Sequence, residues 1–336
     1  MSPRVSVLLP TCQHAATLAA AVGDVLAQTV ADLELVVVDD GSTDGTGEVL
    51  ARCAGSDPRV RAIRTPHRGL VAALQLAAAT ARGAFLARMD ADDRCAPARL
   101  ERQLAWLLDH PGAGATDCHV LLGESAVTGD GMRAHVDWLN SLDGPDDLRR
   151  QLFVESPLVH PACLMRREAF EAAGGYVDDG GGPEDYSLWL RMAAAGWDLG
   201  KVPEALFTWS DLPGRYTRTS PTSGRERLAA LKARHLPGVY PRTREGVQVW
   251  GAGREGLRLA RLLHAAGIRI LRFFDVDPRK IGNRLLDAPV LPLDALEVHP
   301  STFTLVGIGI RSAKPLVRSR MAELGRVEGK NWIFVA

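Results

Sequence analysis

Three short apolar segments near the start of the chain each run directly into polar or acidic residues. They cover residues 5–9 before Pro10, 33–38 before Asp39-Asp40, and 84–89 before Asp90. Between them, residues 15–28 and 69–81 repeat Leu and Val at helical spacing, and residues 42–44 can cap a short helix toward Cys53. Continuous apolar strands that alternate with helices are typical of a parallel sheet covered on both faces. The sequence therefore predicts an α/β fold.

Acidic residues gather where the third segment ends. Ligands of parallel sheets bind at the carboxyl ends of the strands, which places Asp90, Asp92 and Asp93 at one edge with the earlier strand ends. Adjacent carboxylates repel one another when buried, and a divalent cation with a substrate diphosphate is the usual solution. We interpret Asp92 as the metal ligand, Asp90 as a contact to ribose or to a metal-bound water, and Asp93 as a structural cap. The alternative is a solvated acidic loop before Pro97.

A second acidic strand end precedes a glycine and a hydroxyl residue. Asp39, Asp40 and Ser42 follow the strand predicted at 33–38. Carboxylates here can accept hydrogen bonds from a nucleobase imide or a ribose hydroxyl, and the glycines let a ligand approach the backbone closely. An ordinary turn from strand to helix explains the same residues about equally well.

Composition limits the partners. The 336 residues suggest about two domains, and 40 basic residues balance 40 acidic ones, so no overall field attracts nucleic acid or an anionic membrane. The five cysteines form no C-x-x-C pair, which indicates reduced thiols rather than disulfides or a zinc site. With no basic leader and no apolar run long enough to span a bilayer, we expect a cytoplasmic protein, with a peripheral place at membrane assembly machinery left open.

An ordered set of motifs resembles the inverting family 2 glycosyltransferases. The set comprises Leu9-Pro10-Thr11, Val38 to Ser42, Arg88 to Asp93, Pro97 with Arg99-Leu100, His160-Pro161, Gly174-Gly175-Tyr176 and Glu184 to Arg191, across roughly the first two thirds of the chain. The resemblance implies a GT-A fold, a nucleotide-diphosphate sugar donor, and Mg²⁺ or Mn²⁺ at the acidic motif. It also implies that the second acid of the Glu-Asp pair, Asp185, is the general base.

The chemistry of inverting transfer agrees with that assignment. A carboxylate must take the proton of the acceptor hydroxyl, and a metal on the opposite side must stabilise the departing diphosphate, so two separate acidic sites are expected. Glu184 and Asp185 can also be helix-terminal acids that complement the helix dipole. We expect His160 and Glu184 on the acceptor side, with residues 180–183 as an acceptor-side loop. Donor contacts are predicted for Pro10, Thr11, Asp39, Asp40, Ser42, Arg68 and Asp90.

Two arginines follow these motifs in a less recognisable region. Arg215 and Arg218 are candidates for a clamp on the diphosphate, because arginine donates paired hydrogen bonds to phosphate oxygens. A solvated loop is an equal alternative.

A second domain is predicted after a linker. We place a glycosyltransferase domain at 1–236, a linker at 237–245 and a small Rossmann-like α/β domain at 246–336. Its strand at 247–250 leads into a glycine turn with Gly251, Gly253 and Gly256, and Asp275 follows about twenty residues on. It resembles the small nucleotide-binding domains of sugar acyltransferases and polysaccharide-modifying epimerases, which implies NAD or another nucleotide as a ligand. No tyrosine lies in this domain, so we expect sensing, scaffolding or oligomerisation rather than chemistry, with a degenerate and empty fold as the alternative.

The sequence thus predicts an inverting, metal-dependent glycosyltransferase. It would move a sugar from a nucleotide diphosphate, UDP by resemblance, to a hydroxyl of a glycan or glycolipid in polysaccharide assembly. The alternatives are a non-catalytic nucleotide-sugar-binding regulatory or scaffold protein and an oxidoreductase that uses the glycine turn.

Overall fold

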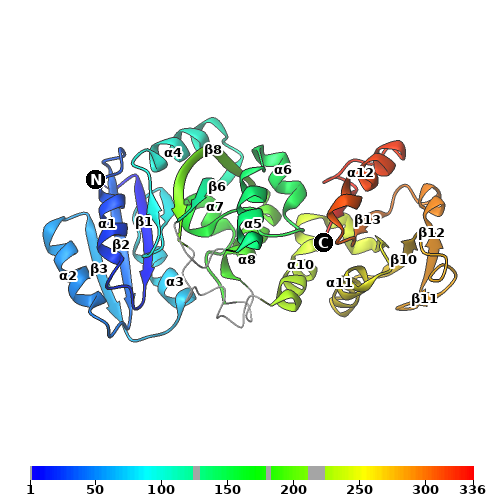
Figure 1. Ribbon diagram of the computed structural model, residues 1–336, viewed down its shortest axis with the longest axis horizontal. Coiled ribbons are helices and arrows are strands. Elements are labelled where there is room, and N and C mark those ends of the chain that lie inside the picture. The colour runs from blue at the N-terminus through cyan, green and yellow to red at the C-terminus, as the bar shows by residue number, and fades with distance from the viewer. Residues whose placement is uncertain (1, 124–128, 179–182, 211–223) are drawn as a thin grey trace. The chain divides into compact units, whose positions relative to one another are not determined.

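The computed structural model of the chain describes residues 2–123, 129–178, 183–210 and 224–336. The chain divides into two compact units (Figure 1). The first comprises Met1–Pro145 and Pro157–Pro221, and the second Asp146–Ser156 and Thr222–Ala336. None of the described helices is long and apolar enough to cross a bilayer.

The first unit contains an eight-stranded sheet in the order β3-β2-β1-β4-β7-β6-β8-β5. Strands β1 to β4 are parallel neighbours, β7 runs antiparallel to both β4 and β6, β8 is parallel to β6, and β5 is antiparallel to β8. The strands are β1 Val5–Thr11, β2 Leu33–Asp40, β3 Val60–Thr65, β4 Phe85–Arg88, β5 Arg94–Cys95, β6 Ala113–Leu122, β7 Leu164–Arg166 and β8 Asp198–Trp209.

Helices join these strands. They are α1 Leu18–Leu26, α2 Thr46–Ser56, α3 Leu70–Thr80, α4 Arg99–Asp109, α5 Asp130–Asn140, the short 3-10 helix η1 His160–Ala162, α7 Arg167–Ala172 and α8 Glu184–Ala194. Helix α6, Gly144–Gln151, leads from the first unit into the second.

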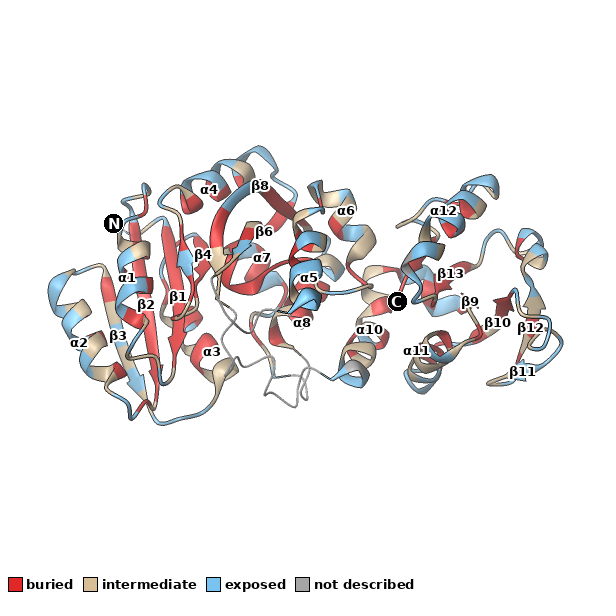
Figure 2. Cartoon of the chain, in the orientation of Figure 1, coloured by how far each residue is buried: buried red, intermediate tan, exposed pale blue. Residues whose placement is uncertain are grey.

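Burial explains why the apolar segments form strands. Every residue of β1 and β2 is buried (Figure 2), as expected for strands covered on both faces. Val5, Val7 and Leu9 of β1 share one hydrophobic core with residues of α1, α2 and α4. The predicted α/β class and the predicted strands are confirmed. Strand β3 was not predicted, because only its first residue is buried and the segment therefore lacks a continuous apolar run.

Strand register brings the predicted site residues to one edge of the sheet. Thr11 pairs with Asp39 at the ends of β1 and β2, while Leu8 pairs with Arg88 at the end of β4. The loop that carries Asp90 therefore leaves the sheet at the same edge as Asp39.

The second unit contains a six-stranded sheet in the order β11-β12-β10-β9-β13-β14, parallel except for the β11–β12 pair. Its strands are β9 Val247–Trp250, β10 Ile270–Asp275, β11 Arg284–Leu285, β12 Ala288–Pro292, β13 Phe303–Val306 and β14 Trp332–Phe334. Its helices are α10 Arg225–Val239, η3 Pro241–Glu245, α11 Arg254–Ala265, η4 Leu293–Val298, η5 Arg311–Ala313 and α12 Lys314–Glu323.

The segment predicted as an exposed linker at 237–245 is helical instead. Helix α10 continues through Pro237 to Val239, and η3 follows directly. Tyr240 and Thr243 are buried, and the Tyr240 ring lies 5.7 Å from that of Phe153 and 5.1 Å from that of Phe303. Aromatic packing therefore fixes a stretch whose prolines suggested an open connection.

A buried ion pair joins β6 to β8. The Lys201 ammonium lies 2.6 Å from both carboxylate oxygens of Asp117, its direct neighbour across the strands, and both side chains are inaccessible to solvent. One of these oxygens also accepts the backbone N–H of Val159 at 2.9 Å. Burial raises the pKa of Asp117, and the Lys201 charge opposes that rise. The pair thus fixes the segment that leads into η1.

Replacing Lys201 with methionine should destabilise the protein strongly, because it leaves the Asp117 carboxylate buried without its counter-ion. We expect a loss of about 3–5 kcal/mol in the free energy of unfolding, measured by urea denaturation. The matched control is Arg102→Met, which removes the exposed pair with Glu204 at 3.5 Å and should cost at most about 1 kcal/mol. Equal effects of the two substitutions would contradict the buried-pair interpretation.

Candidate active site

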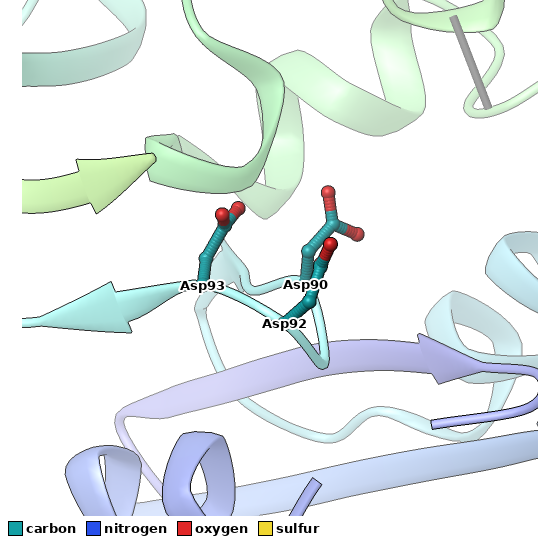
Figure 3. A group of neighbouring side chains, drawn as sticks. All are labelled: Asp90, Asp92 and Asp93. Atoms are coloured by element: carbon teal, nitrogen blue, oxygen red, sulfur yellow. The ribbon is translucent and has the colours of Figure 1, made fainter. Parts of the chain in front are cut away.

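Three carboxylates rise from the loop between β4 and β5 (Figure 3). Figure 3 shows Asp90, Asp92 and Asp93 pointing to the same side of this loop, and one oxygen of each lies within 4.8 Å of the others. Asp93 is buried and accepts the backbone N–H of Ser210 at 2.7 Å, while the Ser210 hydroxyl donates to the backbone oxygen of Asp92 at 2.6 Å. The end of β8 therefore holds the acidic loop in shape.

The chain supplies a cation to this cluster. Arg88 is 1% exposed, donates to the backbone oxygen of Met89, and places Nη2 2.5 Å from an Asp90 oxygen. Burial is the largest influence and disfavours its charge, but the acidic surroundings, Asp90 first among them, together raise the pKa of Arg88 overall. The acids were predicted to need an external cation. Arg88, which stands two residues before Asp90, already balances the charge of Asp90.

A carboxylate-only set of oxygen ligands fits a hard divalent cation. Mg²⁺ and Mn²⁺ prefer such oxygens over nitrogen or sulfur, and the close spacing of the three groups allows them to surround one ion. The acidic loop can therefore hold such an ion between Asp90, Asp92 and Asp93.

Two loops at the edge of the sheet hold each other in place. The Gln13 side-chain amide donates to the Thr43 hydroxyl and accepts the Thr43 backbone N–H, both at 3.0 Å, and the Gln13 backbone N–H donates to Ser42 Oγ at 3.0 Å. Asp44 accepts the backbone N–H of Thr46, the first residue of α2, at 3.1 Å, and the residue between them, Gly45, is the N-cap. Thr11 is buried at the base of these loops, 3.4 Å from His14 Nδ1, and follows buried Pro10.

Asp39 and Asp40 differ in how much of their hydrogen-bonding capacity the chain uses. Asp39 is fully buried, and its Oδ1 accepts the Ser42 N–H at 3.0 Å. Its Oδ2 lies 3.4 Å from Arg64 Nε and has no hydrogen-bond partner in the part of the chain that the structure describes. Asp40 instead accepts the backbone N–H groups of Arg68 and Gly69, each at 2.8 Å.

Asp40 therefore shapes the loop after β3. Its Oδ2 also lies 2.9 Å from His67 Nδ1. Gly41 has φ +75°, and a Cβ there would lie 2.6 Å from the His67 backbone nitrogen, so only glycine fits this contact. The Arg68 side chain is exposed on this loop, and the structure gives it no fixed place at a donor site.

Glu184 and Asp185 open helix α8 beside a buried aromatic cluster. Asp185 is half-buried and accepts the Tyr186 N–H at 2.7 Å, which orients its carboxylate. His160 Nε2 lies 2.8 Å from the Tyr176 hydroxyl, and its Nδ1 lies 3.6 Å from a Glu184 oxygen. The structure thus brings His160, Glu184 and Tyr176 together at the start of α8.

Burial decides the charges on this side. It lowers the pKa of His160 well below the ordinary value, and the Arg88 charge lowers it further, so the imidazole is neutral and its contact with Glu184 is not an ion pair. Burial also raises the pKa of Glu184 to about 7, with a further rise from the Asp185 charge. The pKa of Asp185 is raised by burial, against the hydrogen bond from Tyr186 N–H. A carboxylate with a raised pKa is a stronger base, as proton abstraction requires.

The remaining predicted residues lie elsewhere. Gly251, Gly253 and Gly256 form the turn between β9 and α11, where a Cβ on Gly256 would lie 1.9 Å from the Gly251 oxygen. Asp275 ends β10 and is engaged by the chain itself, through the N–H of Ala252 and Lys280 Nζ, both at 2.9 Å. Arg215, Arg218 and residues 180–182 lie outside the described residues.

Sequence reasoning missed several residues that shape the site, including Gln13, Arg64, Asp117 and Lys201. The local sequence gives no signal for contacts such as Asp117–Lys201, which joins residues 84 positions apart. Arg88 could have been found, because it stands two residues before the acid it neutralises.

Comparisons with known proteins identify the family and the fold. Residues 6–174, half of the chain, match the family described as "Glycosyl transferase family 2". The putative glycosyltransferase EpsE of Bacillus subtilis is 31% identical over 210 residues, which cover 61% of this chain and 72% of that protein. A chondroitin synthase of Pasteurella multocida is 28% identical over 58% of this chain, but the match spans only 19% of the synthase.

Solved structures share the fold. The mannosyltransferase PcManGT of Pyrobaculum calidifontis, in complex with GDP-Man and Mn²⁺, aligns with a TM-score of 0.51 and 25% identity over 79% of this chain and 69% of its own. TarS 1–349 of S. aureus, in complex with UDP-GlcNAc, aligns with a TM-score of 0.54 and 14% identity over 78% of this chain and 70% of its own.

Fold and site together define a glycosyltransferase with a GT-A fold. Within that class, the chain belongs to glycosyltransferase family 2. The predicted family and GT-A fold are confirmed, while the inverting mechanism, the donor base and the Rossmann-like second domain stay predictions.

Glu184 should make the stability of the protein depend on pH. Because the pKa of Glu184 is raised in the folded state, its contribution to the free energy of unfolding is present in full below the ordinary pKa of 4.5. That contribution is lost as the pH rises through about 7. As the pH rises from 5 to 8.5, the midpoint of thermal unfolding of the wild type should therefore fall by a few degrees relative to that of Glu184→Gln. Both are measured with EDTA present. Glu168→Gln, at an exposed residue of α7, is the control and should follow the wild type. Parallel curves for Glu184→Gln and the wild type would refute the assignment.

Proposed function

We propose that the chain is an inverting, metal-dependent glycosyltransferase that moves a sugar from UDP to a hydroxyl of a glycan or glycolipid in polysaccharide biosynthesis. One observation carries the proposal: buried Arg88 holds Asp90 of the acidic loop, and its charge also acts on Glu184 and Asp185 at the start of α8. Two acidic groups are thereby placed around one fixed cation, as expected for a leaving-group side and a base side.

The donor nucleotide would bind along the edge formed by Pro10, Thr11, Asp39, Asp40 and Ser42, with Arg68 and Asp90 nearer the ribose and diphosphate. The Asp39 Oδ2 atom supports this role, because it is buried and can accept the imide N–H of a uracil. Solved relatives hold different donors, GDP-Man in PcManGT and UDP-GlcNAc in TarS. We choose UDP because one imide N–H of uracil matches the Asp39 Oδ2 atom, which has no hydrogen-bond partner among the described residues.

In the proposed reaction, Asp185 takes the proton of the acceptor hydroxyl while the hydroxyl oxygen bonds to the anomeric carbon of the sugar. The bond from that carbon to the diphosphate oxygen breaks on the opposite face, and the diphosphate leaves with the bonding electrons, so the configuration inverts. A divalent ion bound by Asp92, with Asp90 and Asp93 nearby, would stabilise the negative charge on the diphosphate. Glu184 and neutral His160 orient the acceptor side.

The relatives suggest the biological setting. A chondroitin synthase is among them, which favours a polysaccharide or related glycan as the product. In this proposal the enzyme acts in the cytoplasm, and residues 246–336 of the second unit bind a nucleotide or another partner without catalysing a reaction. Arg215 and Arg218 remain candidates for a clamp on the diphosphate.

Asp185→Asn should abolish transfer but not donor binding, because the amide cannot accept the proton. We expect UDP release from a panel of UDP-sugars, with and without candidate acceptors, to fall by about 10²–10⁴-fold. The affinity for UDP with Mn²⁺, measured by calorimetry, should stay within about threefold, because the base does not touch the nucleotide. Glu171→Gln, on the exposed side of α7, is the control. Full turnover in Asp185→Asn would eliminate this base, and binding without turnover in the wild type would favour the nucleotide-sugar-binding scaffold.

Asp92→Asn should weaken the Mn²⁺-dependent part of UDP binding. Replacing one carboxylate by an amide removes a full negative charge from the ligands around the ion. We therefore expect UDP to bind at least about tenfold more weakly with Mn²⁺ and equally well with EDTA. Calorimetric titrations in the two buffers measure both terms. Asp109→Asn, at the exposed end of α4, is the matched control. An unchanged affinity in Mn²⁺ would remove Asp92 as the ligand.

A further inference from the structure

A fully buried arginine lies between the acidic loop and the turn that carries His160. Arg99 begins helix α4, and its side chain is 0% exposed. Its Nη1 and Nη2 both lie 3.2 Å from the backbone oxygen of Arg88, and Nη1 lies 3.0 Å from the backbone oxygen of Pro161. One guanidinium therefore joins two segments that are far apart in the sequence.

Both of those carbonyl groups adjoin functional residues. Arg88 is the buried cation that holds Asp90 of the acidic loop, and Pro161 follows His160, which contacts Tyr176 and Glu184. Arg99 thus connects the leaving-group side of the site to the base side through the backbone alone.

Burying the charge of Arg99 lowers the stability of the fold. Among the described residues no carboxylate lies within ion-pair distance of it, and its Nε has no hydrogen-bond partner there. Carbonyl oxygens and the Phe207 ring, 5.3 Å from Cζ, are its surroundings. A charge without a counter-ion in such a place destabilises the fold relative to a methionine of similar volume. Packing alone therefore does not account for it.

We propose that Arg99 is a positioning residue that makes the acidic loop and the His160 turn move as one unit. A guanidinium suits this task because its planar fork reaches two carbonyl oxygens at fixed angles, which a lysine ammonium does not reproduce. The inference rests on the proposed donor site, since it assigns to Arg99 the transmission of donor binding to the base side.

Gln103, one helical turn further along α4, provides a matched control. Its side-chain amide donates to the backbone oxygen of Ala162 at 2.8 Å and to that of Thr116 at 3.3 Å. It supports the same turn from the same helix but makes no bond to Arg88. Loss of Gln103 should loosen the turn without separating it from the acidic loop.

Hydrogen exchange of the full-length protein, followed by mass spectrometry with and without UDP and Mn²⁺, tests the proposal. In the wild type, UDP with Mn²⁺ should slow exchange in residues 84–95 and also in 157–166, where the N–H groups of Ala162 and Cys163 are bonded within the turn. We expect slowing of about two- to tenfold in the turn, the range for coupling between contacting groups. In Arg99→Lys the slowing should be confined to 84–95, whereas Gln103→Met should keep it in both segments.

A merely structural role for Arg99 predicts a different pattern. Loosened packing would speed exchange in both segments but leave the change caused by the ligand in place. The proposal is overturned if the ligand slows the turn in Arg99→Lys, if Gln103→Met loses the effect equally, or if the wild-type turn does not respond. If Arg99→Lys does not fold, Arg99→Gln is used in its place. In either case, a wild-type turn that exchanges at the same rate with and without UDP and Mn²⁺ contradicts the proposal. A wild type that shows no slowing at 84–95 fails at donor binding, which refutes the proposed function and with it this inference.

Discussion

The buried charge of Arg88 is the constraint on which the site depends. A guanidinium inside a sheet must be compensated, and removing one partner of such a pair costs about 3–5 kcal/mol. Here the compensating groups are Asp90 at 2.5 Å and, less directly, Glu184. The same charge favours the ionised form of Asp185. One strand-end arginine thus holds Asp90 and also opposes the rise that burial causes in the pKa of Glu184 and of Asp185.

A second level of organisation lies behind the charged groups. Neighbouring loops are hydrogen-bonded to the side chains of Asp40, Ser42 and Gln13. Asp117 likewise bonds to Lys201 and to the backbone just before His160. Most polar side chains at this edge therefore fix backbone rather than face a ligand. Such prior ordering lowers the reorganisation that a reaction must otherwise supply.

The parts of this structure that local sequence predicts are those that local physics decides. Continuous apolar runs identified β1, β2 and β4, because strands buried on both faces need them. Strand β3 escaped notice because its burial alternates at a sheet edge, and the end of α10 did so because Pro237 suggested a break where packing of Leu231 and Leu236 sustains the helix. The acids of the site were recognised by residue type. The contacts that hold the site together were not, because Asp117–Lys201, His160–Tyr176 and the bonds of Arg99 to the backbone form only in the tertiary fold.

The path of the chain between the two units has a consequence for how such a protein can be divided. The chain leaves the first unit after Pro145, returns at Pro157 and leaves again after Pro221. Within the second unit, Phe153 from the excursion contacts Tyr240, and the backbone oxygen of Val154 accepts a hydrogen bond from Lys232. No single cut of the polypeptide therefore separates the units cleanly. A gene fusion that simply joined a second domain behind a finished catalytic one does not produce this path, and recombination that exchanged the second unit alone would leave buried Phe153 without its partners.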